Sequence, residues 1–219
     1  MPGPRSAASD SPLPITVEQD EIRRVCRDFS AREIRPISAA VDEADVEVPW
    51  GVWHKAAALG LTSFMLPEEL GGGGLTDVLT GCIVQEELCH GCSGIGNLIT
   101  SGGFFAEPVL ALGTEEQKER WVRPLTGARP PLTALAITEP GAGSDAASIE
   151  TTARRVDGGY VLNGQKTWIS NGGVGELYVV FATVQRGAGH RGITAFLLHR
   201  DDEGLSFGAP MRKMGQRAI

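Results

Sequence analysis

The chain has 219 residues, of which 42% are hydrophobic and 21% are charged, and its net charge is −7 from 20 basic and 27 acidic side chains. These proportions are typical of a globular protein with one large domain or two small ones. They exclude the electrostatic footprint of a nucleic-acid-binding protein, since no basic block with interleaved aromatic residues occurs, and no apolar run approaches the roughly 18 residues that span a bilayer.

The first segment, residues 1–13, is rich in Pro, Ser, Ala and Gly. It lacks the apolar core of a secretory signal and the repeated arginines of a transit peptide. We therefore expect a disordered tail, and a cytoplasmic location follows by default.

Residues 14–130 have helical periodicity, which predicts an all-α N-terminal domain. Thr16 and Gln19 have the spacing of a capping box at the start of a helix. Apolar residues then recur on one helical face at Ile22, Val25, Cys26 and Phe29. Pro36 predicts a kink or a stop.

Further helices are expected along the rest of this domain. They run from about Pro49 to Gly60, from Asp77 to Leu88, from Ile95 to Leu112, and from Thr114 to about Pro124. A glycine-rich loop, residues 66–75, separates the first of them from the second. Tryptophans at helical spacing usually lie in a core, and we interpret Trp50, Trp53 and Trp121 in this way.

Three cysteines lie close together at Cys82, Cys89 and Cys92, and His90 falls inside the CxxC spacing of the last two. A structural zinc site normally takes four ligands from two such pairs, and no second pair is present. A redox pair is expected beside a βαβ pattern, whereas this segment is predicted to be helical. We interpret the cysteines as buried free thiols, with a metal or redox pair as the alternative.

Residues 131–219 change to short strands and turns, which predicts an all-β domain, a barrel or a sandwich. Residues 157–159, Asp-Gly-Gly, and residues 163–164, Asn-Gly, are hairpin signals. Residues 177–184 and 193–198 have the composition of buried strands joined by a polar turn at 186–189. The fold class is therefore α+β, with a helical domain followed by a β domain.

A ligand-binding loop is predicted between Leu135 and Asp145. An apolar strand ends in Thr-Glu-Pro and passes directly into Gly-Ala-Gly-Ser-Asp. Glycine lacks a Cβ atom and allows the backbone to approach a ligand closely. Exposed amides in such a loop can bind an anion or the carbonyls of a polar ring, and Thr138 and Ser144 can add hydroxyl donors at either end.

Two further motifs follow, Asn-Gly-Gln-Lys-Thr-Trp-Ile-Ser-Asn-Gly at residues 163–172 and Lys-Met-Gly-Gln-Arg at 213–217. Together with Pro-Glu-Glu-Leu-Gly-Gly at 67–72 and Glu-Glu-Leu at 86–88, they give a chain that resembles the acyl-CoA dehydrogenase family from about Leu13 to Ile219. It is most similar to the medium- and short-chain members. The resemblance implies a helical N-terminal domain and a β middle domain, which in the family are followed by further strands and a C-terminal helical bundle. We expect a truncated or split product that lacks this bundle.

The resemblance also implies a reaction. Family members use FAD to convert an acyl-CoA to a trans-2-enoyl-CoA: a carboxylate removes the α-proton while hydride leaves the β-carbon for the flavin. Electrons then pass to an electron-transferring flavoprotein. The family's carboxylate lies in the C-terminal domain, beyond Ile219, so no catalytic residue is assigned here.

Positions that match the family's flavin contacts can be assigned residue by residue. Trp168 matches the aromatic residue that packs on the flavin, Ser170 replaces the commoner threonine at N5, and Ser144 matches a residue that also meets the substrate's pantetheine. The implied cofactor-binding set is Leu135, Ile137, Thr138, Gly143, Ser144, Trp168, Ile169 and Ser170. We interpret Glu139 and Asp145 as salt-bridge or cap residues that brace the loop, and Lys166 as a solvated strand charge.

Three functions remain open from the sequence. The first is an acyl-CoA dehydrogenase half that acts in a homo- or hetero-oligomer with a chain supplying the C-terminal helical domain. The second is a non-catalytic remnant that binds acyl-CoA or assembles with a relative. The third is a related acyl-CoA oxidase or flavin monooxygenase. Acyl chain length also stays open, because small residues and phenylalanines in the segment 95–105 give opposing cues.

Overall fold

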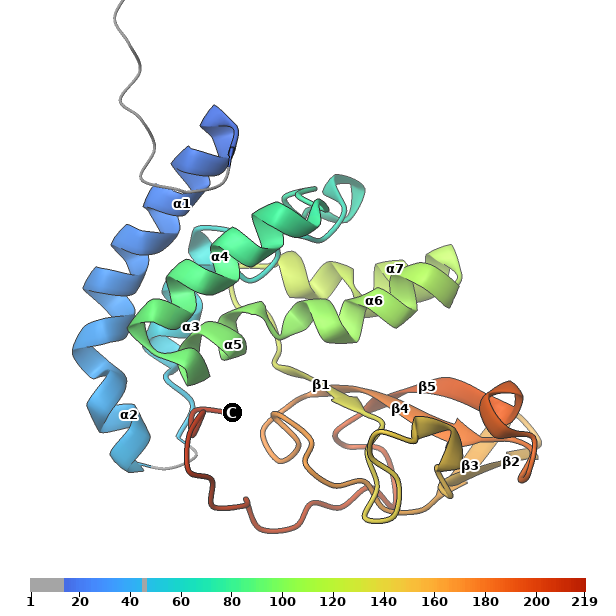
Figure 1. Cartoon of the computed structure of the whole chain (residues 1–219). Helices are drawn as coiled ribbons and strands as arrows, with labels where there is room; N and C mark the ends of the chain where they lie inside the picture. Colours follow the sequence, from blue (N-terminus) through green and yellow to red (C-terminus); the bar gives the residue numbers. More distant parts are fainter. Residues whose placement is uncertain (1–13, 45–46) are drawn as a thin grey trace, which may run out of the picture.

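The computed structural model describes residues 14–44 and 47–219, so the predicted tail 1–13 lies outside the described residues. A helical region precedes a β-sheet region along the chain, and the two lie side by side (Figure 1). This order confirms the predicted α+β fold class.

The first helix, α1 (Val17–Phe29), begins at the predicted capping box. The Gln19 N–H donates to the Thr16 hydroxyl at 3.1 Å, and the Thr16 N–H donates to the Gln19 side-chain oxygen at 3.0 Å. The helix does not stop before Pro36. It continues through a π-helical turn, η1 (Ser30–Ile34), and a 3-10 turn, η2 (Arg35–Ile37), into α2 (Ser38–Ala44).

The other helices fall in the predicted stretches, except that the single helix predicted from Ile95 to Leu112 is two helices. They are α3 (Trp50–Ala58), α4 (Val78–Gly91), α5 (Ser93–Thr100), α6 (Gly102–Leu112) and α7 (Glu115–Trp121), with 3-10 turns η3 (Glu68–Leu70) and η4 (Arg123–Thr126). The helix predicted from Thr114 is α7, and it begins with a second capping box formed by Thr114 and Gln117. The principal helical core gathers residues of α1, α4 and α5, among them Cys26, Leu88, Ile95 and Ile99, all fully buried.

The three predicted core tryptophans behave differently. Trp53 is 2% exposed, and its indole N–H donates to the carbonyl of Pro130 at 3.1 Å, which ties α3 to the chain that enters the sheet. Trp121 is partly buried against a core cluster. Trp50 is 43% exposed, so its prediction was wrong: it is the first residue of α3 and stacks on His54 of the same helix instead of packing into the core.

By length and composition alone, the stretch Ser93–Leu112 could cross a membrane. The sequence had led us to expect no apolar run of that length. It forms two helices that meet at Ser101. Ile95, Leu98 and Phe105 within it are completely buried in the protein core. The stretch therefore packs as core helices in this structure.

The β region is one mixed sheet of five strands, β1 (Thr133–Ala136), β2 (Thr152–Val156), β3 (Gly159–Asn163), β4 (Leu177–Thr183) and β5 (Ile193–His199). Strand β4 is central. It pairs with β1 in parallel, with β5 in antiparallel register, and at Thr183 with the start of β2 in parallel. The parallel pairings arise because β1 and β4 are joined by a long excursion rather than by a hairpin.

One of the two predicted hairpin turns is present. Strands β2 and β3 pair in antiparallel register around Asp157 and Gly158, and Gly158 has φ 82°, which a glycine accepts without strain. The predicted turn at residues 163–164 was wrong, because β3 ends at Asn163 and a loop leads on to β4. Gly164 is needed for packing instead, since a Cβ atom there would lie 2.3 Å from the Thr151 hydroxyl oxygen.

The helices and the sheet share a hydrophobic cluster. Phe105 and Val109 of α6 belong to it, together with Leu177 and Val179 of β4. Helix α6 therefore lies over the sheet near β1 and β4 (Figure 1). After β5 the chain returns to the helical region, where Ala218 joins the helical core.

Candidate functional site

The loop after β1 begins with a tight turn. The N–H of Glu139 donates to the carbonyl of Ala142 at 3.0 Å, and the N–H of Ala142 donates back to the carbonyl of Glu139 at 3.1 Å. A Cβ atom added at Gly141 or Gly143 would meet nothing within 4 Å. Neither glycine is required by packing within the protein, so both leave open backbone that a ligand can approach.

A buried ion pair joins this loop to the second motif. The Lys166 ammonium lies 2.7 Å from the Glu139 carboxylate, and the side chains are 11% and 7% exposed. The other oxygen of Glu139 accepts from the N–H of Glu150 at 2.7 Å, and the N–H of Thr151 donates to the same oxygen as Lys166 at 3.0 Å. The bracing role predicted for Glu139 is confirmed, whereas the prediction that Lys166 is a solvated charge was wrong.

The electrostatics of the pair follow from its burial. Burial by itself raises the pKa of Glu139, but the hydrogen bonds from Lys166, Thr151 and Glu150 outweigh it and bring the pKa down to about 2. Burial lowers the pKa of Lys166, and the charge of Glu139 offsets part of that change. The ionised form of Glu139 is stabilised more than that of Lys166, because the carboxylate accepts from backbone N–H groups in addition to Lys166. The carboxylate is therefore fully ionised at neutral pH and is a structural acceptor, not a proton-transfer group.

Two further hydrogen bonds align the two motifs. The Lys166 ammonium also donates to the carbonyl of Ile137 at 2.8 Å, and the N–H of Thr167 donates to the carbonyl of Thr138 at 2.9 Å. Segments 137–139 and 166–167 therefore run beside each other, although 27 residues separate Glu139 from Lys166. The structure brings the two sequence motifs into one site.

The second motif holds two residues in a left-handed backbone conformation, Trp168 with φ 58° and Asn171 with φ 59°. Such values are uncommon outside glycine and mark a loop whose shape is imposed by its surroundings. Asn171 is buried, and its amide donates to the carbonyl of Thr133 at 3.0 Å and to the Ser101 hydroxyl at 3.3 Å. Asn171 was not predicted as a site residue, although the tolerance of asparagine for positive φ was an available signal in the sequence.

Trp168 is turned outward by this loop and is 67% exposed. An exposed tryptophan beside open glycine backbone offers a flat apolar surface to a ring-shaped ligand. In the described part of the chain, the hydroxyls of Thr138, Ser144 and Ser170 make no hydrogen bond to protein, so all three are available as donors.

The remaining predicted site residues have mixed positions. Gly143 is exposed in the loop, and the Ile137 carbonyl is engaged by Lys166. Leu135 and Ile169 pack against core clusters, so they support the site from the protein interior. Asp145 precedes the 3-10 turn η5 (Ala146–Ser148) and accepts a hydrogen bond from the Ser148 hydroxyl, but its side chain makes no capping bond to a backbone N–H of the turn.

The cysteines lie away from this site and differ in burial. Cys26 is completely buried, Cys89 and Cys92 are half-buried, and Cys82 is exposed. The prediction of buried thiols, made for Cys82, Cys89 and Cys92, was therefore wrong for Cys82, which α4 turns to the surface, and holds only in part for the two half-buried cysteines. Over residues 14–44 and 47–219, no group of three or more His, Cys, Asp or Glu side chains is arranged to hold a metal ion.

Comparison with known proteins decides the family. Residues 16–128 match the family described as acyl-CoA dehydrogenase, N-terminal domain, and residues 134–219 match acyl-CoA dehydrogenase, middle domain. The chain belongs to the acyl-CoA dehydrogenase family. Both motifs of the site lie in the middle-domain match.

Individual acyl-CoA dehydrogenases show the extent of the match. The short-chain specific acyl-CoA dehydrogenase of Bos taurus mitochondria is 39% identical over 198 residues, which cover 90% of this chain and 47% of that protein. Butyryl-CoA dehydrogenase from Megasphaera elsdenii has a TM-score of 0.84 and 33% identity, covering 95% of this chain and 55% of its own. A glutaryl-CoA dehydrogenase from Mycobacterium smegmatis, solved with FADH2, has a TM-score of 0.83 and 27% identity, covering 93% and 51%. The chain thus spans about half the length of these relatives.

Proposed function

We propose that this chain forms the flavin-ring side of an FAD-dependent active site that oxidises an acyl-CoA to a 2-enoyl-CoA. The observation that supports this most directly is the joining of the two loops by Glu139 and Lys166. It leaves an exposed indole, three unengaged hydroxyls and open glycine backbone around one region of the surface.

These residues fit the polar ring system of FAD. The Thr138 hydroxyl can donate to the carbonyl-bearing edge of a flavin, and the glycine turn leaves room for the backbone to come close. The face of Trp168 can pack on the ring. The chemistry that bound FAD supplies here is acceptance of a hydride from the β-carbon.

The chain's own residues bind and orient the flavin ring and the acyl-CoA. Donors at the ring's polar edge stabilise the negative charge that develops there, and they act strongly because the protein holds them in place beforehand. Ser144 stands at the exposed end of the loop, where it can donate to the pantetheine arm of an acyl-CoA. Glu139 is not offered as the base, because Lys166 and two backbone N–H groups engage its carboxylate.

Removal of the α-proton requires a carboxylate that the described residues do not place at this site. We propose that it comes from the C-terminal helical portion of the family fold, whether continuous with this chain or on a second one within an oligomer. Electrons then leave for an electron-transferring flavoprotein. A short acyl chain is the first substrate to test, because short-chain enzymes are among the relatives with about 40% identity.

A reconstitution experiment tests this proposal. The chain is mixed with the C-terminal portion of a short-chain relative, and FAD retention is measured by absorbance after gel filtration. Reduction of a dye acceptor by butyryl-CoA is then followed. We expect both signals from the mixture and neither from the separate parts. Absence of FAD retention in the mixture, with both parts folded, would instead favour a non-catalytic remnant.

Two substitutions test the residue assignment in the reconstituted mixture. Trp168→Ala should weaken FAD retention, because it removes the packing surface for the ring. Thr138→Val should slow flavin reduction roughly tenfold or more, since a lost hydrogen bond of this kind costs about 1–3 kcal/mol. Trp50→Ala and Thr194→Val change exposed residues outside the site and serve as matched controls. If activity is indifferent to both site substitutions, the assignment of these residues is wrong even though the family is right.

A further inference from the structure

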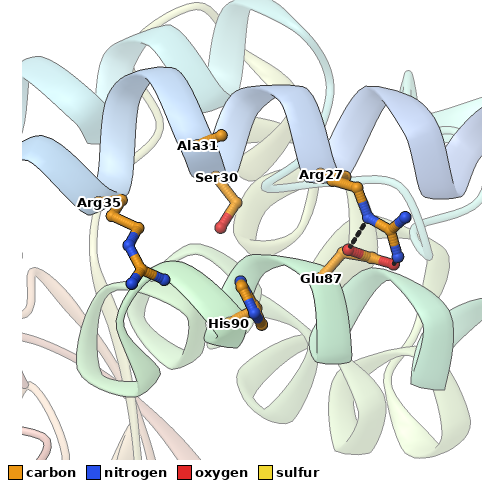
Figure 2. Close-up of a pocket in the computed structure, with 6 residues that line it drawn as sticks. All are labelled: Arg27, Ser30, Ala31, Arg35, Glu87 and His90. Carbon is orange, nitrogen blue, oxygen red and sulfur yellow. Dashed lines mark hydrogen bonds and ion pairs between the residues drawn. The ribbon is translucent and has the colours of Figure 1, made fainter.

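A pocket lies on the helical domain, far along the chain from the flavin loops. It has a volume of about 270 Å³ and sits between the α1–η2 run and the C-terminal half of α4 (Figure 2). Its lining residues are Arg27, Ser30, Ala31, Arg35, Glu87 and His90. Four of these six side chains can donate hydrogen bonds through N–H or O–H groups, which is unusual for a groove between two helices.

The local backbone explains why these side chains meet. Arg27, Ala31 and Arg35 follow one another at intervals of four, so they share one face of the continuous run of helical turns. The π-helical turn Ser30–Ile34 lies within this run. Opposite it, α4 comes very close because residue 91 is glycine: a Cβ atom there would lie 2.5 Å from the Ser30 hydroxyl oxygen. Gly91 therefore lets the two helices approach each other closely beside the pocket.

The charges in the pocket do not cancel. Arg27 donates through Nε to Glu87 at 2.9 Å and through Nη2 at 2.7 Å, so both oxygens of that carboxylate are engaged in a bidentate pair. Arg35 contributes a further positive charge. Over residues 14–44 and 47–219, no carboxylate forms an ion pair with Arg35. The pocket thus has a net positive charge with its one carboxylate already neutralised.

The donors converge from both walls. Ser30 and Arg35 are directed from the α1–η2 side toward α4, and the His90 ring stands toward them from α4 (Figure 2). The Ser30 hydroxyl has only a long contact of 3.5 Å to the carbonyl of Leu88, so it can reorient toward a ligand. A guanidinium, an imidazole N–H and a hydroxyl around one space match the several oxygens of a tetrahedral oxyanion.

We propose that this pocket binds a phosphate group, either free phosphate or the phosphate monoester end of a small metabolite. Arg35 is the principal anchor, and His90 and Ser30 supply the other hydrogen bonds. Arg27 keeps Glu87 neutralised, which removes the repulsion that a bare carboxylate would exert on the anion. The pocket volume leaves room beside the phosphate for part of an organic group. The site is independent of the flavin loops and would stand if the proposed enzymatic function failed.

Isothermal titration calorimetry on the full chain tests the proposal. Inorganic phosphate and ribose 5-phosphate are titrated separately, with sodium chloride at the same ionic strength as the reference. We expect saturable binding at one site per chain with a Kd of about 1 mM or lower. Tighter binding of the ester identifies a metabolite site, and equal or tighter binding of inorganic phosphate identifies a free phosphate site.

The variants locate the site. Arg35→Gln should weaken binding at least tenfold, and His90→Gln should weaken it severalfold. Arg32→Gln is the matched control, because Arg32 lies on the same segment, its side chain is exposed, and it forms an ion pair with Asp28. Its affinity should equal that of the wild type. Circular dichroism verifies that each variant is folded. If Arg35→Gln does not fold, the affinity of His90→Gln alone decides whether phosphate binds in this pocket.

Three results would overturn the proposal. The first is the absence of saturable heat with either phosphate compound. The second is unchanged affinity in folded Arg35→Gln, or in folded His90→Gln where that variant alone decides. The third is an equal loss in Arg32→Gln, because that would show nonspecific attraction of phosphate to surface arginines.

Discussion

The Glu139–Lys166 pair is the contact whose loss we expect to cost most. Replacing Lys166 with methionine keeps an unbranched side chain one heavy atom shorter and removes its charge, which leaves a buried carboxylate with backbone donors only. The pKa of Glu139 falls from the ordinary value of 4.5 to about 2 in the folded chain. A shift of this size corresponds to about 3 kcal/mol of stability, with 1.36 kcal/mol per unit.

That figure is an upper value for the pair. Burial lowers the pKa of Lys166, so folding disfavours the charged lysine. This cost offsets part of the stability that the ionised carboxylate contributes. We therefore expect Lys166→Met to lower the free energy of unfolding by about 2–3 kcal/mol at pH 7. Because a glutamine leaves no buried charge, the double variant Glu139→Gln, Lys166→Met should recover part of this loss.

The pH dependence has a definite sign. A carboxyl with a lowered folded pKa contributes stability that is present above its unfolded pKa and is lost as the pH falls through the folded pKa. For Glu139 the window lies between about pH 5 and pH 2. In Lys166→Met the carboxyl takes up its proton at higher pH, so the difference from the wild type should shrink across this window.

Urea unfolding followed by circular dichroism measures these effects at several pH values. Lys55→Met is the matched control, because Lys55 pairs with Glu33 at 2.6 Å but is 60% exposed, and such a pair contributes under about 1 kcal/mol. The reasoning is refuted if Lys166→Met costs no more than Lys55→Met, or if its cost is the same at pH 7 and pH 2.5.

Two further predictions rest on burial and packing. Burial raises the pKa of Cys26 to about 12, and the charge of Glu87 adds to the shift. Iodoacetamide at pH 8 should therefore leave Cys26 unmodified in the folded chain while it alkylates the exposed Cys82. Equal modification of the two cysteines, measured by mass spectrometry, would contradict this. Gly72→Ala should lower the free energy of unfolding by about 1–3 kcal/mol, because its Cβ would lie 2.2 Å from a backbone carbonyl oxygen. Gly173→Ala, where the space is open, should leave the urea midpoint within error, and equal effects of the two would refute the packing argument.

The sequence by itself determined features that depend on neighbours along the chain. The capping box at Thr16 formed as predicted and a helix begins at Thr114 as predicted, since in both cases the partner glutamine lies three residues away and no tertiary contact is required. The same reason made three other features predictable from the sequence. They are the order of helices before strands, the two-residue turn at Asp157 and Gly158, and the motifs that identify the family.

Only the tertiary structure decided which charges and apolar groups are buried. Lys166 was predicted to be solvated, yet it is enclosed by segment 137–139, and Trp50 was predicted to be core, yet it is exposed. Periodicity gives the face of a helix or strand but not what covers it, because burial depends on contacts between residues far apart in the chain. The meeting of Arg35 with His90 across the helical pocket has the same origin: two helices approach closely where Gly91 has no side chain to keep them apart.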